Sequence, residues 1–219
     1  MSETAAPSEP LAVRGAVELY GASLGGREPL VLRDQTGAAR PLPLDTWLGT
    51  AGAVDERVLD RAIGPVLDVG CGPGRHVHAL ARRGVLAVGV DVSPVAVALA
   101  RRRGATVLEA SIFDRLPGAW RTALLLDGNI GIGGRPDALL RRLTALLAAG
   151  GIVLVELDPP GTGLARRQVR LEAGGMVSDW FAWAHVGAEA IAIPARAAGL
   201  RVAASWHDEG RWFAALEAP

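Results

Sequence analysis

Three glycines and two aspartates have the types and spacing needed to hold a ligand that contains a nucleoside. Gly70, Gly72 and Gly74 follow a short apolar run that ends in Asp68-Val. Glycines let the backbone turn tightly and let a ligand lie against it. A helix that begins just after such a loop offers free N–H groups to an anionic group of the ligand.

Asp91 strengthens this interpretation, because it ends the next apolar run, Val88-Gly-Val-Asp91. An acid at the end of the second strand of such a unit can accept hydrogen bonds from both ribose hydroxyls. The alternative is an ordinary surface carboxylate. The glycine spacing also bears on the ligand, since nicotinamide-type sites usually read Gly-x-Gly-x-x-Gly, whereas this loop reads Gly-x-Gly-x-Gly with an acid two residues ahead.

Strands that alternate with helices are expected to position these residues. The predicted strands are short apolar runs without strict alternation, which is typical of parallel strands buried on both faces. Ser93-Pro94 predicts the start of a helix that ends near Gly104, and leucines at helical spacing predict a helix over Pro136–Ala149 closed by Gly150-Gly151. The strands are Val66–Val69, Ala87–Asp91, Ala105–Glu109, Thr122–Asp127 and Ile152–Leu157.

This order predicts an α/β fold with a doubly wound, mostly parallel sheet and right-handed crossovers. Leu200–His207 and Arg211–Leu216 flank the turn Asp208-Glu-Gly210. Two strands joined so tightly must be antiparallel. We therefore expect an antiparallel last strand.

The chain divides into three predicted parts. Residues 1–10 are polar and proline-rich and read as a disordered tail. Residues 11–62 form an N-terminal extension with a hairpin around residues 30–44 and a helix capped by Asp55 that runs to Ala62. Residues 63–219 form the main domain, with an insertion over 161–187.

Composition narrows the possible functions. The 219 residues carry 23 basic and 23 acidic side chains, a formal net charge of zero, and nucleic-acid binders usually show a basic excess. One cysteine excludes an internal disulfide, and the four histidines lack the spacing of a metal site. No signal peptide or membrane-length apolar run is visible. We therefore expect a cytoplasmic protein without a metal, a nucleic-acid partner or a membrane segment.

The motifs resemble the cofactor-binding core of the class I S-adenosylmethionine (SAM) dependent methyltransferases. The similarity is carried by Asp68-Val-Gly-Cys-Gly-Pro-Gly74 and Gly89-Val-Asp-Val-Ser-Pro94, and it extends through Val107–Pro117, Leu126-Asp127 and Gly150–Val155. The resemblance implies a Rossmann-like fold and SAM as the cofactor. It favours SAM over a nicotinamide.

The resemblance also implies roles for individual residues. Asp68 would help hold the ammonium group of SAM and Asp91 would bind its ribose, while Ser111 stands where the family often has an aspartate at the adenine. The glycine loop would line the methionine part. The implied cofactor-binding residues are Asp68, Gly70, Cys71, Gly72, Gly74, Asp91, Val92, Ser111, Ile112, Asp127 and Gly128.

The acceptor side is predicted around Asn129 and the insertion. If residues 177–185 are extended, Phe181, Trp183 and His185 share one face with Asp179. These aromatic residues either close over the acceptor or simply pack the insertion onto the sheet. Weak candidates for a catalytic base are His185 and His207, the latter also explained as a solvated turn residue. Tyr20 and Trp47 are alternative lid residues.

The predicted function is methyl transfer from SAM to a small-molecule acceptor by in-line displacement. Much of such catalysis comes from positioning the nucleophile, and a base is needed only for an acceptor that is protonated at neutral pH. The acceptor atom and the oligomeric state remain open. The alternatives are a SAM-binding protein without methyl transfer and an NAD(P)-dependent oxidoreductase.

Overall fold

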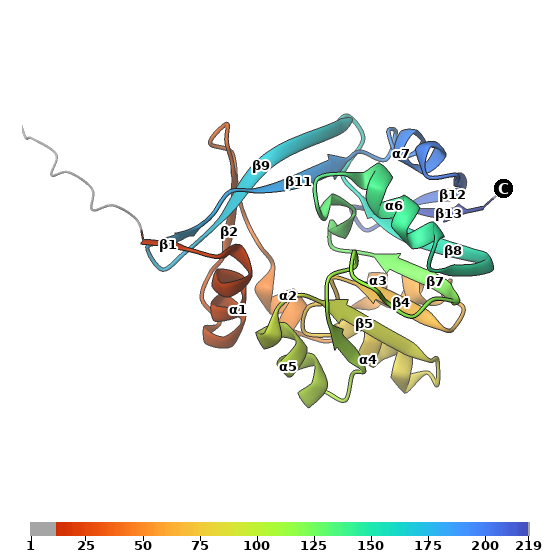
Figure 1. The fold of residues 1–219 in the computed structure, drawn as a ribbon, viewed down its shortest axis with the longest axis horizontal. Helices are drawn as coiled ribbons and strands as arrows, with labels where there is room; N and C mark the ends of the chain where they lie inside the picture. The colour runs from red at the N-terminus through yellow and green to blue at the C-terminus, as the bar shows by residue number, and fades with distance from the viewer. Residues whose placement is uncertain (1–11, 219) are drawn as a thin grey trace, which may run out of the picture.

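The computed structural model of the chain describes residues 12–218. The predicted N-terminal tail, residues 1–10, lies outside the described residues. Two sheets organise the rest, a seven-stranded sheet and a smaller six-stranded sheet. Figure 1 shows the smaller sheet beside the carboxyl ends of the central strands of the larger one.

The seven-stranded sheet has the order β12-β13-β8-β7-β4-β5-β6. The five strands from β8 to β6 are mutually parallel, and β13 pairs antiparallel with both β8 and β12. This confirms the predicted doubly wound fold and its antiparallel last strand. The strands are β4 (Val66–Val69), β5 (Ala87–Asp91), β6 (Val107–Glu109), β7 (Trp120–Leu125), β8 (Leu147–Leu157), β12 (Arg201–Asp208) and β13 (Arg211–Glu217).

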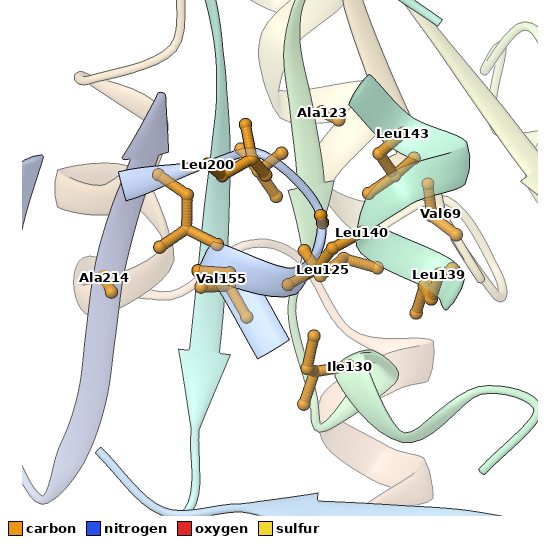
Figure 2. Packing of buried hydrophobic residues seen from close by; sticks show 14 of the residues in the cluster. Val69, Ala123, Leu125, Ile130, Leu139, Leu140, Leu143, Val155, Leu200 and Ala214 are labelled. Atoms are coloured by element: carbon orange, nitrogen blue, oxygen red, sulfur yellow. The ribbon is translucent and has the colours of Figure 1, made fainter. Parts of the chain in front are cut away.

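Helices cover both faces of this sheet, because successive residues of its central strands point to opposite sides. Leu125 and Val155 pack with α6 (Pro136–Thr144) and α7 (Ala192–Ala197), as Figure 2 shows. Leu124 and Leu154 pack on the other side. The helices there are α3 (Ala53–Leu59), α4 (Arg75–Arg82) and α5 (Pro94–Arg102).

Local sequence explains where the helices beside the glycine loop begin. Ser93 caps α5, accepting a hydrogen bond from the Ala96 N–H at 3.3 Å, as its position before Pro94 predicts. Gly74 caps α4 with a φ of +78°, and a Cβ there would lie 2.8 Å from the Ala100 Cβ. Gly74 is therefore needed for turning the chain and for packing α4 against α5.

The smaller sheet unites the N-terminal extension with the insertion. Its order is β1-β10-β9-β2-β3, and β11 also pairs with β9. Helices α1 (Ala16–Gly26) and α2 (Leu44–Leu48) contribute Leu19, Leu24, Leu44 and Leu48 to the same hydrophobic cluster as residues of β2 and β9. The strands are β1 (Ala12–Arg14), β2 (Val31–Asp34), β3 (Ala39–Pro41), β9 (Leu164–Ala173), β10 (Met176–Ser178) and β11 (Phe181–Val186).

Sequence reasoning found the β2–β3 hairpin but missed α1, and two helix predictions need correction. Asp55 is not the cap of α3 but its third residue, where its carboxylate accepts a hydrogen bond from the Gly52 N–H at 3.0 Å, and α3 ends at Leu59. The helix predicted over Pro136–Ala149 ends at Thr144. The Leu146 carbonyl accepts a hydrogen bond from the Trp120 N–H instead, so the chain enters β8 before Gly150.

Residues 177–185 are also not one extended segment, because β10 ends at Ser178 and β11 begins at Phe181. The Ser178 hydroxyl accepts a hydrogen bond from the Leu171 N–H and donates one to the Asp179 carbonyl. This side-chain link replaces strand pairing at the break. Asp179 therefore does not continue the face formed by the residues of β11.

Replacing Leu140 by alanine is expected to destabilise the main domain. Leu140 is fully buried between α6 and the sheet, and a cavity at such a site costs about 2–5 kcal/mol. The free energy of unfolding from urea denaturation measures the effect. Leu86→Ala is the control, because Leu86 is 67% exposed, and an equal loss in both variants would contradict the packing described.

Candidate functional site

A cavity of about 750 Å³ lies at the carboxyl ends of β4, β5, β7 and β8. The glycine loop after β4 and the residues after β5 and β7 line it, together with residues of β11, β3 and α1. Ligands of open α/β sheets bind at this edge, where the strand order reverses. The cavity size is within the range of small-molecule sites.

The glycine loop is shaped for close approach. Gly70 and Gly72 have φ values of +66° and +52°, which favour glycine. A Cβ at Gly70 would lie 2.8 Å from the Asn129 amide nitrogen, and a Cβ at Gly72 would lie 3.0 Å from the Tyr20 hydroxyl. Asn129 donates hydrogen bonds to the Val69 and Gly70 carbonyls at 2.8 and 3.0 Å. Asn129 therefore connects the end of β7 to the loop.

Asp91 faces the cavity from the end of β5 and is only 8% exposed. Its carboxylate accepts hydrogen bonds from the Gly72 and Ser93 N–H groups, both at 2.8 Å. Burial raises the pKa of Asp91, and these backbone donors oppose the increase. A carboxylate held in this way keeps lone pairs for hydroxyl donors from a ligand.

The Cys71 side chain packs closely against Gly89 of β5. Its thiol occupies the space beside Gly89 where a Cβ would otherwise stand. Burial, followed by the nearby charges of Asp68 and Asp91, raises the pKa of Cys71 well above its ordinary value. The thiol is therefore protonated at neutral pH and is a poor nucleophile.

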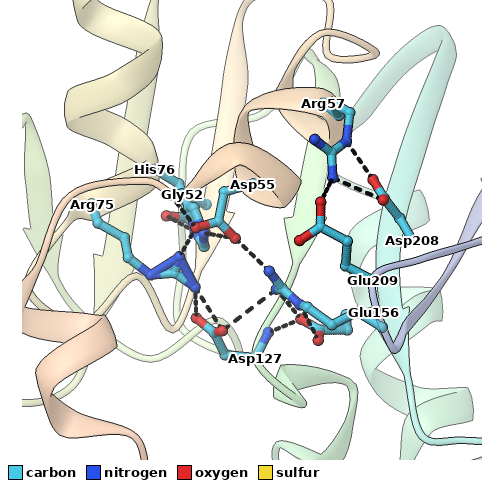
Figure 3. A network of polar contacts seen from close by, with 11 residues as sticks. Gly52, Asp55, Arg57, Arg75, His76, Asp127, Glu156, Asp208 and Glu209 are labelled. Carbon is cyan, nitrogen blue, oxygen red and sulfur yellow. Dashed lines mark hydrogen bonds and ion pairs between the residues drawn. The ribbon is translucent and has the colours of Figure 1, made fainter.

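A network of ion pairs joins cavity-lining residues to the buried carboxylate of Asp55 (Figure 3). Arg75 contacts Asp55 at 2.5 Å and both oxygens of Asp127 at 2.7 Å. Arg211 contacts Asp55 at 2.7 Å and makes two hydrogen bonds with Glu156 at 2.8 and 2.7 Å. Glu156 also accepts a hydrogen bond from the Asp127 N–H at 2.7 Å. The ends of β7 and β8 are thereby tied to α3, α4 and β13.

His76 extends this network below the glycine loop. Its ring nitrogens lie 3.6 Å from the carboxylates of Asp55 and Asp68, and all three side chains are at least 95% buried. Burial alone would lower the pKa of His76, but the two carboxylates outweigh it and raise the pKa to about 9. The imidazole is therefore a buried cation at neutral pH.

Most residues predicted for the cofactor line the cavity, but Asp68 and Gly74 do not. Asp68 is 1% exposed beneath the loop, beside His76. Ser111 lines the cavity, and its hydroxyl accepts a hydrogen bond from the Phe113 N–H. The predicted residues on the cavity wall are Gly70, Cys71, Gly72, Asp91, Val92, Ser111, Ile112, Asp127 and Gly128.

The structure also brings the predicted acceptor residues Asn129, Phe181, Trp183 and His185 to this cavity. The Phe181 and Trp183 rings meet edge to face, with their centroids 6.2 Å apart. The Trp183 indole lies against Gly131, where any Cβ would collide with it. His207 is not on the cavity wall and packs instead on Trp212 in the adjacent strand, with 4.5 Å between ring centroids.

The N-terminal extension contributes a second aromatic pair, Tyr20 and Trp47, to the cavity wall. Their ring centroids are 6.2 Å apart. Burial raises the pKa of Tyr20 well above its ordinary value, and the charge of Asp91 adds to this increase. The phenol is therefore a neutral hydrogen-bonding group beside the glycine loop.

Several charged residues of the site escaped the sequence analysis. Glu156 and Asp158 stand at the carboxyl end of a predicted strand, a position that could have identified them. Arg75 directly follows the glycine loop. The sequence around Arg40 and Arg211 does not indicate a site, because only the tertiary fold brings β3 and the β12–β13 turn to the cavity.

Neither a metal-binding cluster nor a bilayer-crossing helix is present in residues 12–218. No group of three or more His, Cys, Asp or Glu side chains in that range is placed to hold a metal ion. No helix there combines the length and the apolar character needed to cross a bilayer.

Comparisons with known proteins agree with this geometry. Residues 66–151 match a family model described as a methyltransferase domain. A trans-aconitate 2-methyltransferase of Afipia carboxidovorans is 34% identical over 116 residues, 48% of this chain and 44% of that protein. A second such enzyme, from Paracidovorax citrulli, is 34% identical over 108 residues, 46% of this chain and 41% of that protein. The chain thus matches less than half the length of these curated relatives.

Solved structures show the same fold. A SAM-dependent methyltransferase from Bacteroides fragilis, in complex with S-adenosyl-L-homocysteine, superposes with a TM-score of 0.81 at 21% identity, over 97% of this chain and 100% of that one. An amino pentose methyltransferase from Micromonospora echinaspora gives a TM-score of 0.56 at 18% identity, over 76% and 89% of the two chains. The first comparison includes the smaller sheet as well as the main one.

The charge of His76 predicts how stability depends on pH. Because its pKa rises from 6.5 to about 9 on folding, its stabilising contribution is complete below pH 6.5 and is lost as the pH rises through 9. We expect the free energy of unfolding to fall by about 2 kcal/mol between pH 6.5 and 8.5. Urea denaturation at both pH values measures this change.

His76→Gln should remove that pH dependence, whereas His78→Gln on the same helix should keep it. The window ends at pH 8.5 so that Cys71 and Tyr20, whose pKa values are raised by burial, contribute little. A pH dependence that persists unchanged in His76→Gln would show that another group is responsible.

Proposed function

We propose that this chain, whose residues 66–151 match a methyltransferase domain model, is a class I SAM-dependent methyltransferase that transfers the methyl group of SAM to a small-molecule acceptor held in the cavity. One observation carries the proposal. The cavity joins a glycine loop and a buried ribose-type carboxylate, Asp91, to an aromatic wall formed by Phe181 and Trp183. A cofactor and an acceptor could thus lie in one enclosed space.

The residues present fit SAM on several counts. Gly70 and Gly72 leave open the space that side chains would fill, so the methionine part can lie against the backbone. Asp91 is placed to accept the ribose hydroxyls. Val92 and Ile112 offer apolar contacts for the adenine, and the Ser111 hydroxyl lies at the same edge. Asp68 lies beneath the loop beside His76 and is not part of the cavity wall.

When bound, SAM supplies a methyl group on a positively charged sulfur, which is already activated for displacement. The work left to the protein is to hold the nucleophile in line with the breaking bond and to exclude water. Asn129 fixes the end of β7 against the glycine loop. Phe181 and Trp183 from β11, and Tyr20 and Trp47 from the N-terminal extension, add aromatic surface to the cavity wall.

A small acceptor is favoured by the shape and the charge of the chain. The cavity of about 750 Å³ must hold both SAM and the acceptor, and the net charge of zero lacks the basic excess that is usual in nucleic-acid binders. The similar trans-aconitate and amino pentose methyltransferases are both named for small acceptors.

Replacing Asp91 by alanine should weaken cofactor binding. Loss of charge-assisted hydrogen bonds to the ribose should reduce the affinity for SAM and S-adenosylhomocysteine by about 1.5–3 kcal/mol. Isothermal titration calorimetry measures this, with NAD and NADP expected to give no heat of binding. Asp60→Ala is the control, because Asp60 is exposed and lies away from the cavity. Equal affinity in the Asp91 variant would refute its ribose role.

Replacing Trp183 by alanine should separate cofactor binding from methyl transfer. Trp183 lines the cavity and packs on Gly131, so its loss should misplace the acceptor while SAM still binds. We expect SAM affinity within about twofold of wild type and a fall in kcat/KM of roughly tenfold or more, because positioning dominates such reactions. Release of S-adenosylhomocysteine measures transfer. Trp180→Ala, outside the cavity lining, should change neither quantity.

A further inference from the structure

We propose that His185 is the general base of the methyl transfer and that the acceptor presents a hydroxyl or an ammonium group that must lose a proton. This inference rests on the proposed function and specifies its substrate class. His185 stands on β11 on the same strand face as Phe181 and Trp183, and it lines the cavity together with Asp158.

The contact between His185 and Asp158 determines which ring nitrogen is available. His185 Nδ1 lies 3.3 Å from Asp158 Oδ2, which also accepts a hydrogen bond from the Val186 N–H at 3.1 Å. Burial raises the pKa of Asp158, but the contacts with His185 outweigh it and hold the pKa below its ordinary value. An ionised carboxylate only accepts hydrogen bonds, so Nδ1 is the donor in this contact, and in the neutral imidazole Nε2 then keeps its lone pair.

Nε2 is free to take a proton from a ligand. It has no hydrogen-bond partner in residues 12–218, and the side chain is 19% exposed, on the cavity wall. Asp158 is itself fixed, because its N–H donates to the Val186 carbonyl and its carbonyl accepts from the Ala188 N–H. A fixed carboxylate that orients a histidine is the usual arrangement around a catalytic base.

The path of β11 places His185 on the wall of the cavity that the cofactor-side residues also line. Ile132, next to the short helix η1 (Asn129–Gly131), forms a bridge with Trp183 of β11. The end of β7 thus supports the strand that carries His185. His185 and the cofactor-side residues Asp127 and Gly128 line the same cavity.

Few other charges act on His185. Arg40 of β3 lies close enough to help lower the pKa of Asp158. In β9, the strand paired with β11, Arg166 and Arg167 form ion pairs with Asp137 and Asp34. Glu156 of β8 is paired with Arg211. Asp158 is the carboxylate that contacts the His185 ring directly.

The proposed reaction transfers a methyl group from SAM to the acceptor and a proton from the acceptor to His185. A lone pair on the acceptor oxygen or nitrogen forms a bond to the methyl carbon of SAM, and the carbon–sulfur bond breaks with its electron pair passing to sulfur. The proton on the acceptor atom moves to His185 Nε2 as a hydroxyl attacks or, for an ammonium group, before the attack, because its nitrogen has no lone pair until that proton has left. The products are the methylated acceptor, S-adenosylhomocysteine and an imidazolium held by Asp158, which then loses its proton to water.

This chemistry discriminates between acceptor classes. A carboxylate is already deprotonated at neutral pH and needs no base, whereas an alcohol, a phenol or an ammonium group does. The competing explanation is that the contact between His185 and Asp158 only holds β11 against the end of β8. In that case, loss of the His185 imidazole would not change how the rate depends on pH.

The test uses the full chain with SAM and a panel of phenols, alcohols, amines and carboxylic acids that includes catechol, benzylamine and trans-aconitate. Release of S-adenosylhomocysteine reports turnover, and calorimetry reports SAM binding independently. We expect turnover with hydroxyl or amine probes. Turnover confined to carboxylic acids, or absent for every hydroxyl and amine, would overturn the inference. Intact SAM binding with carboxylate turnover would leave the proposed function standing.

Variants then separate a base from a structural tie. With an accepted probe, His185→Gln should lower kcat by about 10²–10⁴-fold and abolish the rise of kcat with pH, with little change in SAM affinity. Asp158→Asn should lower kcat with little change in SAM affinity, because the carboxylate that orients the imidazole is gone. His207→Gln, outside the cavity, should match wild type. A His185→Gln variant with an unchanged pH profile would overturn the inference.

Discussion

The carboxylate of Asp55 is only 3% exposed, and its charge must be balanced by protein groups. Arg75 and Arg211 contact it at 2.5 and 2.7 Å, and the cation of His76 lies 3.6 Å away. Ionic groups lose several kcal/mol of hydration on burial, and removing one partner leaves the others uncompensated. The cluster therefore forms as a unit, and it can form only when α3, α4 and β13 are all in place.

The ion pairs around Asp55 contact the site through Asp127 and Glu156, at the ends of β7 and β8. Asp127 has a φ of +56°, a conformation that a non-glycine residue rarely adopts. Arg75 holds its side chain and Glu156 holds its N–H. Gly128 and Asn129 continue this turn, and Asn129 reaches the carbonyls of Val69 and Gly70. The shape of the glycine loop thus depends on charges that never touch the ligand space themselves, such as Asp55.

Sequence reasoning succeeded where local rules decide the structure. The apolar runs of β4 and β5 and the Ser93-Pro94 helix start were found with their observed bounds. Sequence reasoning failed where a residue distant in the sequence determines the local structure. Leucine spacing extended a helix past Thr144, although the Leu146 carbonyl is taken by Trp120 of the neighbouring strand. Arg211 pairs with residues far back in the chain, and no local pattern encodes such a partner.

The same reason explains why the sequence predicts two alternative lids, the insertion and the N-terminal extension, although both segments belong to one sheet. A hairpin such as β2–β3 is marginal alone, but β2 pairs with β9, and Leu32 lies opposite Leu171 in a shared buried cluster. Pairing of β9 with β11 then sets which β11 side chains face the cavity, with Trp183 opposite Arg167 and His185 opposite Ala165. Because side chains alternate along a strand, a slip of one residue would turn Phe181, Trp183 and His185 away from the cavity together. The N-terminal extension therefore helps to orient the acceptor wall through β9, in addition to contributing Tyr20 and Trp47 to the cavity.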